Sequence, residues 1–296
     1  VLHQFKPELI HAHLPNFFFF LLFLSKYPCP LVLHWHADVV SSAIDMKMAW
    51  LYWLYNPWET FLIKKADRIL CTSNAYRESS RPLRRFKDKL DVLPLGISPR
   101  RLAASNNADR IQNGRPRFKV LSVGRFAYYK GFEYLIQAAE KLDDVSIIIV
   151  GEGPRYPAMK KLVEQKGLQS RVNLLGKVEQ GRLGFLFAEC DVFCLPSIER
   201  TEAFGIVLLE ALSHGKPLIT TKIEGSGVNE VNQNASTGIQ VPVADADALA
   251  EAINYLREHP ARRKEMGKQA RLRFSRYYHI NTVAGELDEL YQNLLA

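Results

Sequence analysis

Short apolar runs alternate with longer amphipathic segments along the whole chain. An apolar run bounded by polar residues predicts a buried strand, whereas apolar positions at helical spacing predict an amphipathic helix. The runs in the N-terminal part predict strands at 9–13, 31–36, 68–72 and 90–95. Strands that alternate with helices are typical of a parallel sheet covered by helices.

A second series of the same kind follows a polar segment at 104–117, which has no periodicity and is predicted to be a linker. Its predicted strands are 118–123, 145–150, 172–175, 191–195, 217–221 and 238–241, and its predicted helices are 130–142, 158–165, 182–188, 206–213, 245–258 and 280–295. The pattern predicts two doubly wound, Rossmann-like α/β domains, at 1–103 and 118–276, and a terminal helix within 277–296. Ligands bind at the carboxyl ends of the strands in such sheets, so two facing domains would form a cleft.

Length and composition agree with two globular domains. The chain has 296 residues, of which 47% are apolar and 24% charged, and a typical domain has ~150 residues. These values exclude a disordered or fibrous chain. The longest apolar run, 17–24, is shorter than the ~20 residues that span a bilayer, so it predicts a buried helix.

The cysteines and the start of the chain refine this picture. The four cysteines lack the paired spacing of a metal site, which favours reduced thiols and a cytoplasmic location. The chain opens at Val1 on residues that resemble the middle of a domain, and the first domain has fewer predicted strands than the second. We therefore expect the first domain to be incomplete at its N-terminus.

The formal net charge of +8 is concentrated in two basic clusters, at 81–89 and 257–276. Solvated helix faces are the favoured interpretation of these clusters. The alternative is attraction to phosphates, either of an anionic membrane surface or of a phosphorylated substrate. Nucleic acid is a poor candidate partner, because no aromatic residues that could stack on bases are interleaved with the basic ones.

Two cations follow the first predicted strand of the second domain. Arg125 and Lys130 come directly after Gly124, in the loop before a helix that opens near Gly131. Free backbone N–H groups and the helix dipole add to such side chains, so the loop is a candidate anion site. An ordinary surface loop with two basic residues is the equal alternative.

Two carboxylates lie around the predicted helix 206–213. Glu202 is in the loop before this helix, and Glu210 stands among apolar residues within it. A half-buried carboxylate needs a partner, and ligand hydroxyls could supply one. The alternative is that Glu210 pairs with a neighbouring Arg or Lys.

Together these segments resemble the retaining glycosyltransferases of group 1, family 4, which have the GT-B fold. The family has a loop of the form G-R-x-x-x-x-K-G and a later block of the form E-x-F-G-x-x-x-x-E. Here they stand as Gly124 to Gly131 and Glu202 to Glu210, and the stretches IIIVGEGP (147–154), DVFCLPS (191–197) and ALSHGKPLITT (211–221) also match. The resemblance covers essentially the whole chain.

The resemblance implies a role for each matching position. Arg125 and Lys130 would bind the donor diphosphate and stabilise the charge of the leaving nucleotide without a metal. Glu202 would contact the donor sugar, and Glu210 would hold the ribose hydroxyls. The remaining implied donor contacts are Gly124, the backbone amides of Ala203, Phe204, Gly205 and Ile206, and backbone groups near Lys177 and Val178 that would border the base.

The first domain contributes the stretch LVLHWHADVV, residues 31–40. Side chains alternate along a strand, so His34, His36 and Asp38 are expected to share one face. The resemblance makes His36 the residue that reaches the donor sugar, so the implied catalytic residues are His36, Arg125, Lys130 and Glu202. Asp38 and Ser73 are expected at the edge of the cleft.

The resemblance also describes the substrates and the setting. The donor would be a nucleoside diphosphate sugar, GDP-mannose or a UDP-hexose, and the acceptor a glycan or a lipid-linked glycan made at the cytosolic face of the inner membrane. No cofactor or metal is expected. The terminal helix would cross back to brace the first domain. The family's N-terminal glycine-rich loop does not precede His3, so an inactive chain that binds nucleotide sugar is one alternative.

A metal-dependent hydrolase is the other alternative. His34, His36 and Asp38 resemble the start of the hydrolase pattern H-x-H-x-D-H, and two histidines with a carboxylate can hold zinc. Position 39 is Val where the pattern needs His. His11 and His13 could supply ligands from a neighbouring strand, but we prefer to place them at the core edge or the cleft.

Overall fold

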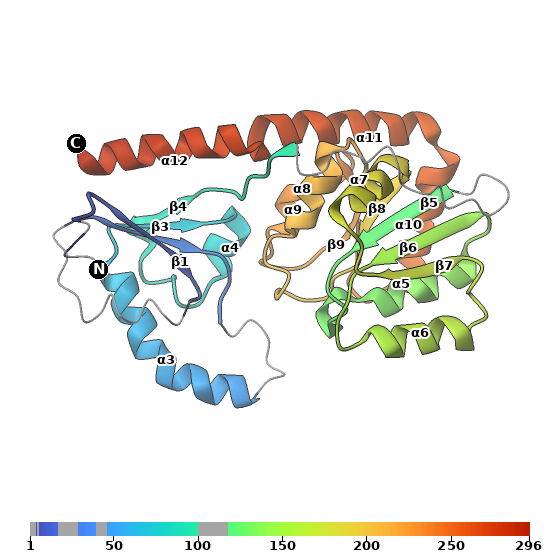
Figure 1. The fold of residues 1–296 in the computed structure, drawn as a ribbon, viewed down its shortest axis with the longest axis horizontal. Coiled ribbons are helices and arrows are strands. Elements are labelled where there is room, and N and C mark those ends of the chain that lie inside the picture. The colour runs from blue at the N-terminus through green and yellow to red at the C-terminus, as the bar shows by residue number, and fades with distance from the viewer. Residues whose placement is uncertain (1–3, 5, 17–28, 40–45, 100–117) are drawn as a thin grey trace.

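Two parallel sheets organise the chain. The computed structural model describes residues 4, 6–16, 29–39, 46–99 and 118–296, so the expected helix at 17–24 and the expected linker at 104–117 lie outside the described residues. Figure 1 shows the two α/β units side by side, with α12 lying along the first unit and α11 along the second. The predicted architecture of two α/β units, each built on a parallel sheet, is confirmed.

The first sheet has four parallel strands in the order β1-β2-β3-β4. Its elements are β1 (Ile10–Leu14), β2 (Leu31–Trp35), α3 (Met46–Lys65), β3 (Arg68–Cys71), α4 (Asn74–Ser79) and β4 (Leu90–Val92). In β2 all five residues are buried, which is the pattern of a central strand covered on both faces. Each strand agrees with its apolar run to within a few residues at either end.

The second sheet has six parallel strands in the order β10-β9-β8-β5-β6-β7. Its strands are β5 (Phe118–Val123), β6 (Val145–Val150), β7 (Val172–Gly176), β8 (Val192–Leu195), β9 (Leu218–Thr221) and β10 (Gly238–Val241). Its helices are α5 (Phe132–Ala138), α6 (Tyr156–Gln165), α7 (Gln180–Glu189), α8 (Ile206–Ser213), α9 (Val228–Val231), α10 (Ala246–Glu258) and α11 (Pro260–Arg273). Apolar side chains form one buried cluster on each face of this sheet.

The helix expected at 130–142 is interrupted at its start. A 3-10 turn covers Tyr128–Lys130, Gly131 is left-handed with φ 63°, and α5 begins only at Phe132. A Cβ at Gly131 would lie 2.2 Å from the Pro196 carbonyl oxygen, so no larger residue fits here. Because of this break, the Lys130 side chain points into the molecule and is only 7% exposed. The predicted continuous helix would instead have placed Lys130 in its first turn.

The last helix, α12 (Ile280–Leu295), joins the two units. His279 caps its start, since the ring Nδ1 accepts from the Asn281 amide at 3.2 Å. From there α12 runs back along the first domain (Figure 1). The apolar residues of this contact are Val32, Leu70, Leu93, Val283, Leu287, Leu290, Tyr291 and Leu294.

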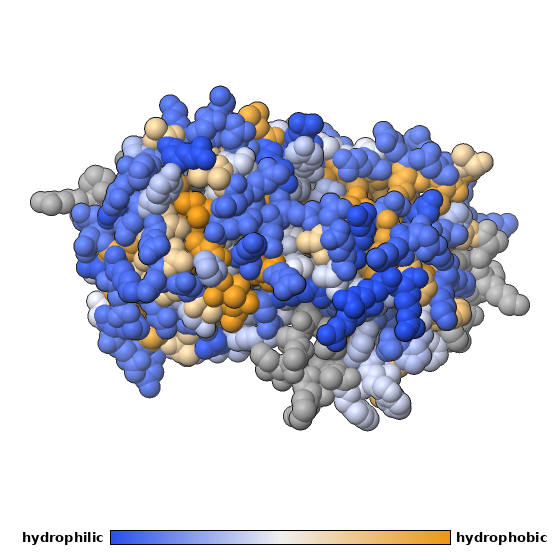
Figure 2. Space-filling view, turned by 180° about the vertical axis from the view of Figure 1, so that it is seen from behind, coloured by the Kyte–Doolittle hydropathy of each residue, from blue (hydrophilic) through white to orange (hydrophobic). Residues whose placement is uncertain are grey.

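The surface is mostly hydrophilic, and Figure 2 shows hydrophobic residues in separate patches on the rear face. Within the described ranges, no helix has both the length and the apolar character that crossing a membrane requires. The basic cluster at 257–276 lies largely on α11 and is mainly exposed, as expected for a solvated helix face.

Candidate functional site

A buried ion pair joins the two motifs of the second domain. Lys130 Nζ lies 2.5 Å from Glu202 Oε2, and the two residues are only 7% and 8% exposed. The Lys130 side chain crosses Gly124, where an added Cβ would meet Lys130 Cε at 3.1 Å. Gly124 therefore leaves space for the lysine side chain. Because Lys130 follows β5 and Glu202 follows β8, their ion pair joins the carboxyl ends of these two strands in one site.

Small hydroxyl residues hold Glu202 in place. Ser197 Oγ donates to the same carboxylate oxygen at 2.8 Å. The Thr221 hydroxyl donates to the Ser197 carbonyl, and the Ser226 hydroxyl donates to the Glu202 carbonyl. Sequence analysis missed these three residues, although each follows or ends a buried strand or borders the same loop.

Arg125 lies beside this pair and is exposed. In the part of the chain that the structure describes, no side chain forms an ion pair with it. Glu202 already offsets the charge of Lys130, whereas Arg125 has no such partner among the described residues. The arrangement suits an anion that Arg125 holds with two N–H groups while Lys130 supplies a point charge.

The backbone after Glu202 leads into α8 through Gly205, which is left-handed with φ 76°. Phe204 is buried, Ile206 is 51% exposed, and Ala203 packs against the core of the first domain. The first amides of a helix have no partner within it, so the start of α8 presents N–H groups at the site. Lys177 and Val178 follow β7, where Lys177 is exposed and Val178 is half-buried.

Glu210 is the second carboxylate of the motif, on α8. Burial raises the pKa of its carboxyl from 4.5 to about 7. No ion pair reaches it from the residues that the structure describes, so the expected alternative of a neighbouring Arg or Lys is wrong there. Hydrogen bonds from ligand hydroxyls would favour its charged form and lower the pKa.

Glu210 therefore predicts a pH-dependent stability. Its folded-state pKa of about 7 lies above the unfolded value of 4.5. Between these values the unfolded chain binds fewer protons, so the free energy of unfolding falls as pH rises and stays lower above pH 7. Glu210→Gln removes this loss and should raise stability at pH 8 by up to about 3 kcal/mol.

The measurement is denaturant unfolding at pH 5 and pH 8. Glu251→Gln is the control, because Glu251 is exposed on α10. A Glu210→Gln variant that is less stable than the parent chain at pH 8 would contradict an unpaired, buried carboxylate.

The histidines of β1 and β2 lie together on one face of the first sheet. We call His11, His13, His34 and His36 the histidine cluster. His13 pairs with His34 in register between the strands, and the His34 and His36 ring centroids are 4.4 Å apart. His13 Nδ1 lies 2.8 Å from His36 Nε2. His11 and His13 are thus neighbours of His36 rather than isolated core residues.

Asp38 does not share this face, so that expectation is wrong. The strand ends at Trp35, and the alternation of side chains reaches His36 but not Asp38. Asp38 Oδ1 instead accepts from the indole of Trp35 at 2.9 Å and from Ser80 Oγ at 2.6 Å. The carboxylate that the hydrolase pattern needs is therefore bound elsewhere, and the H-x-H-x-D set is not brought together.

The same carboxylate links the two domains. Arg200, from the loop before α8, donates to Asp38 Oδ2 at 2.8 Å, and its guanidinium lies 4.1 Å from the centre of the Tyr76 ring. Sequence analysis gave Arg200 no role. Asp38 and Arg200 form a buried interdomain ion pair.

Ser73 lies at the same boundary. Its Oγ caps α4 by accepting from the Tyr76 amide at 3.1 Å, and a Cβ at Gly227 of the second domain would meet it at 2.9 Å. Glu230 of the second domain accepts from the Ala75 amide at 2.5 Å. The start of α4 is therefore held against the second domain.

Comparisons with known proteins match both halves of the chain. Residues 105–273 match the family described as glycosyl transferases group 1, and residues 1–96 match a glycosyl transferase 4-like domain. The chain is 32% identical to O-antigen chain mannosyltransferase C of Escherichia coli, over 97% of this chain and 76% of that protein. It is 31% identical to D-rhamnosyltransferase WbpZ of Pseudomonas aeruginosa, over 92% of this chain and 70% of that protein.

Solved structures show the same architecture. The Anabaena protein HepE, crystallised in complex with UDP, superposes with a TM-score of 0.81 at 20% identity, over 99% of this chain and 80% of that chain. The two matched domains, the aligned relatives and the shared architecture all agree with the resemblance that the motifs indicate. The chain belongs to the glycosyl transferases group 1 family and is a glycosyltransferase with the GT-B fold.

Proposed function

We propose that this chain is a retaining, metal-independent hexosyltransferase of surface polysaccharide biosynthesis. Its donor is a nucleoside diphosphate sugar, GDP-mannose in the first place and a UDP-hexose in the second. Its acceptor is a glycan or lipid-linked glycan. The observation that carries the proposal is the buried Lys130–Glu202 pair beside the uncompensated Arg125, at the carboxyl ends of β5 and β8.

The donor diphosphate binds next to Arg125 and Lys130. Arg125 binds two phosphate oxygens. Lys130 forms an ion pair with the diphosphate in addition to its ion pair with Glu202. Glu202 then has lone pairs for the sugar hydroxyls, while Ser197 keeps its carboxylate in position. The amides of Ala203 to Ile206 approach the same phosphates, and Glu210 accepts from the ribose hydroxyls.

Transfer follows without a side-chain nucleophile. The bond from the anomeric carbon to the phosphate oxygen breaks, and the acceptor oxygen bonds to that carbon on the same face. The leaving phosphate takes the acceptor proton. Arg125 and Lys130 stabilise the charge that grows on the phosphate, which is electrostatic catalysis by preorganised cations. His36 approaches the donor sugar from the first domain.

The proposed location is the cytosolic face of the inner membrane, with peripheral contact. The basic residues on α11 would favour anionic headgroups. Exposed aromatic side chains on α3 would favour a membrane contact of the first domain, since Trp50 and Trp53 are 63% and 71% exposed.

A thermal-shift panel tests the donor proposal. GDP, UDP, ADP and dTDP are offered alone and as their common sugar conjugates, with and without EDTA. A ligand at ~100 times its Kd stabilises the fold by about 2.7 kcal/mol, so one base should raise Tm clearly. We expect GDP and GDP-mannose to do so, equally in EDTA.

Each other outcome has a meaning. A shift with UDP only would replace the mannosyl donor by a UDP-hexose. No shift with any nucleotide, or a shift that EDTA abolishes, would contradict the proposed metal-independent donor site. Binding without transfer to any acceptor would support an inactive nucleotide-sugar-binding chain.

A further inference from the structure

The histidine cluster has a property that glycosyl transfer does not use. Within the described chain, the Nε2 atoms of His11 and His34 are buried and have no hydrogen-bond partner. His34 is only 6% exposed. A buried nitrogen without a partner loses its hydration and gains nothing in return. Two such nitrogen atoms on one face of the sheet could act as ligands of a metal ion, which accepts their lone pairs.

Two other ring nitrogens already have hydrogen-bond partners. His11 Nδ1 is hydrogen-bonded to the hydroxyl of Tyr291 on α12, and His13 Nδ1 to His36 Nε2. A neutral imidazole carries one N–H and one lone pair. If Nδ1 of His11 and of His13 carry the proton, Nε2 of each presents its lone pair.

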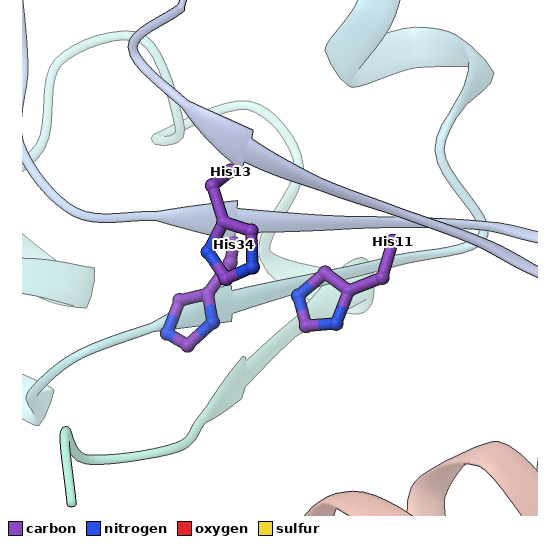
Figure 3. Close-up of side chains that lie close together, drawn as sticks. All are labelled: His11, His13 and His34. Atoms are coloured by element: carbon purple, nitrogen blue, oxygen red, sulfur yellow. The ribbon is translucent and has the colours of Figure 1, made fainter.

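The three histidines also have suitable placement. One ligand atom from each of His11, His13 and His34 lies within 4.8 Å of the others. Figure 3 shows the rings on the same side of β1 and β2, with nitrogens facing the space between them. Zinc binding would require these atoms to move closer together, by rotation about the side-chain torsion next to the ring, which is broad for histidine.

We propose that His11, His13 and His34 form a binding site for a d-block divalent cation, represented by Zn²⁺. Three imidazole nitrogens and one open position are an established ligand set for tetrahedral zinc. The ligands are neutral and contain no carboxylate, which disfavours Mg²⁺ and Ca²⁺.

Tyr291 would act as a positioning residue for this site. A metal-bound histidine usually holds its second nitrogen in a hydrogen bond that fixes the ring. The Tyr291 hydroxyl meets His11 in this way from α12. The bound ion would therefore tie β1 and β2 to α12, which packs along the first domain.

The test is zinc binding by the tag-free chain after EDTA treatment and desalting. Calorimetry should give one Zn²⁺ per chain, and Co²⁺ should give the intense visible bands of a tetrahedral site. We expect Tyr291→Phe to weaken zinc binding about 10-fold, and His11→Gln and His34→Gln to weaken it more. His259→Gln is the matched control, because His259 is an exposed histidine outside the cluster.

Circular dichroism and Tm identify variants that fail to fold. If one of the two ligand variants does not fold, the other still tests the site. Zinc that binds the His11→Gln and His34→Gln variants as tightly as the parent chain would overturn the proposal. So would a parent chain that binds no zinc. The result is independent of the nucleotide panel, since the donor site uses none of these three histidines.

Discussion

Glu202→Gln and Lys130→Met should each lower kcat/KM for glycosyl transfer by about 10²–10³-fold, the usual cost of removing one preorganised electrostatic group. Each single change also leaves the other charge buried without its partner. Breaking a buried pair in this way costs about 3–5 kcal/mol. Both variants should therefore lose stability as well as activity.

The double variant separates the two effects. Changing both residues together removes the uncompensated charge, so much of the stability should return while transfer stays low. The measurements are donor kinetics and unfolding of the two single variants and the double. Lys141→Met is the control, because Lys141 pairs with Asp247 at an exposed site. A Lys130→Met variant within twofold of the parent activity would contradict a phosphate-binding role.

Arg200→Ala should weaken the contact between the domains. The change leaves the Asp38 carboxylate, which is 7% exposed, with neutral donors only. The expected loss is about 3 kcal/mol or more, from an unpaired buried charge. In a chain of this size each kcal/mol lowers Tm by about 2–4 °C. Arg200 belongs to the same loop as Glu202, so we also expect KM for the donor to rise.

Arg200→Lys should not restore the parent behaviour. Lysine lacks the planar guanidinium group, so it cannot stack on the Tyr76 ring and donate hydrogen bonds to Asp38 at the same time. Arg155→Ala is the control, since Arg155 pairs with Glu133 within the second domain and is 39% exposed at its side chain. If Arg200→Ala and Arg155→Ala lower Tm equally, the Asp38–Arg200 pair does not hold the domains together.

Most helices and strands of this fold can be predicted from local sequence patterns. The helix bounds 206–213 and 280–295 predicted from apolar spacing are those of α8 and α12. The parallel strands also follow their apolar runs, because a strand covered on both faces has to be apolar throughout. Element type depends mainly on residues that are close in the sequence, and one sequence displays those residues completely.

The order of the two motifs likewise indicates the family and the edge of the sheet where the site lies. The resemblance names Lys130 and Glu202 as donor residues. It does not show that these two side chains, 72 residues apart, form a buried pair. That pairing depends on Gly131 breaking the helix and on Gly124 leaving space for the lysine, which are contacts between segments.

Tertiary packing alone decides the remaining features. Asp38 leaves the histidine face because the strand ends at Trp35, and Arg200 reaches it from the other domain. The histidine cluster forms because β1 and β2 pair in a register that sets His13 against His34. Periodicity along one segment says which side chains share its face. The partners across strands and domains are set by register and packing, which no single segment contains.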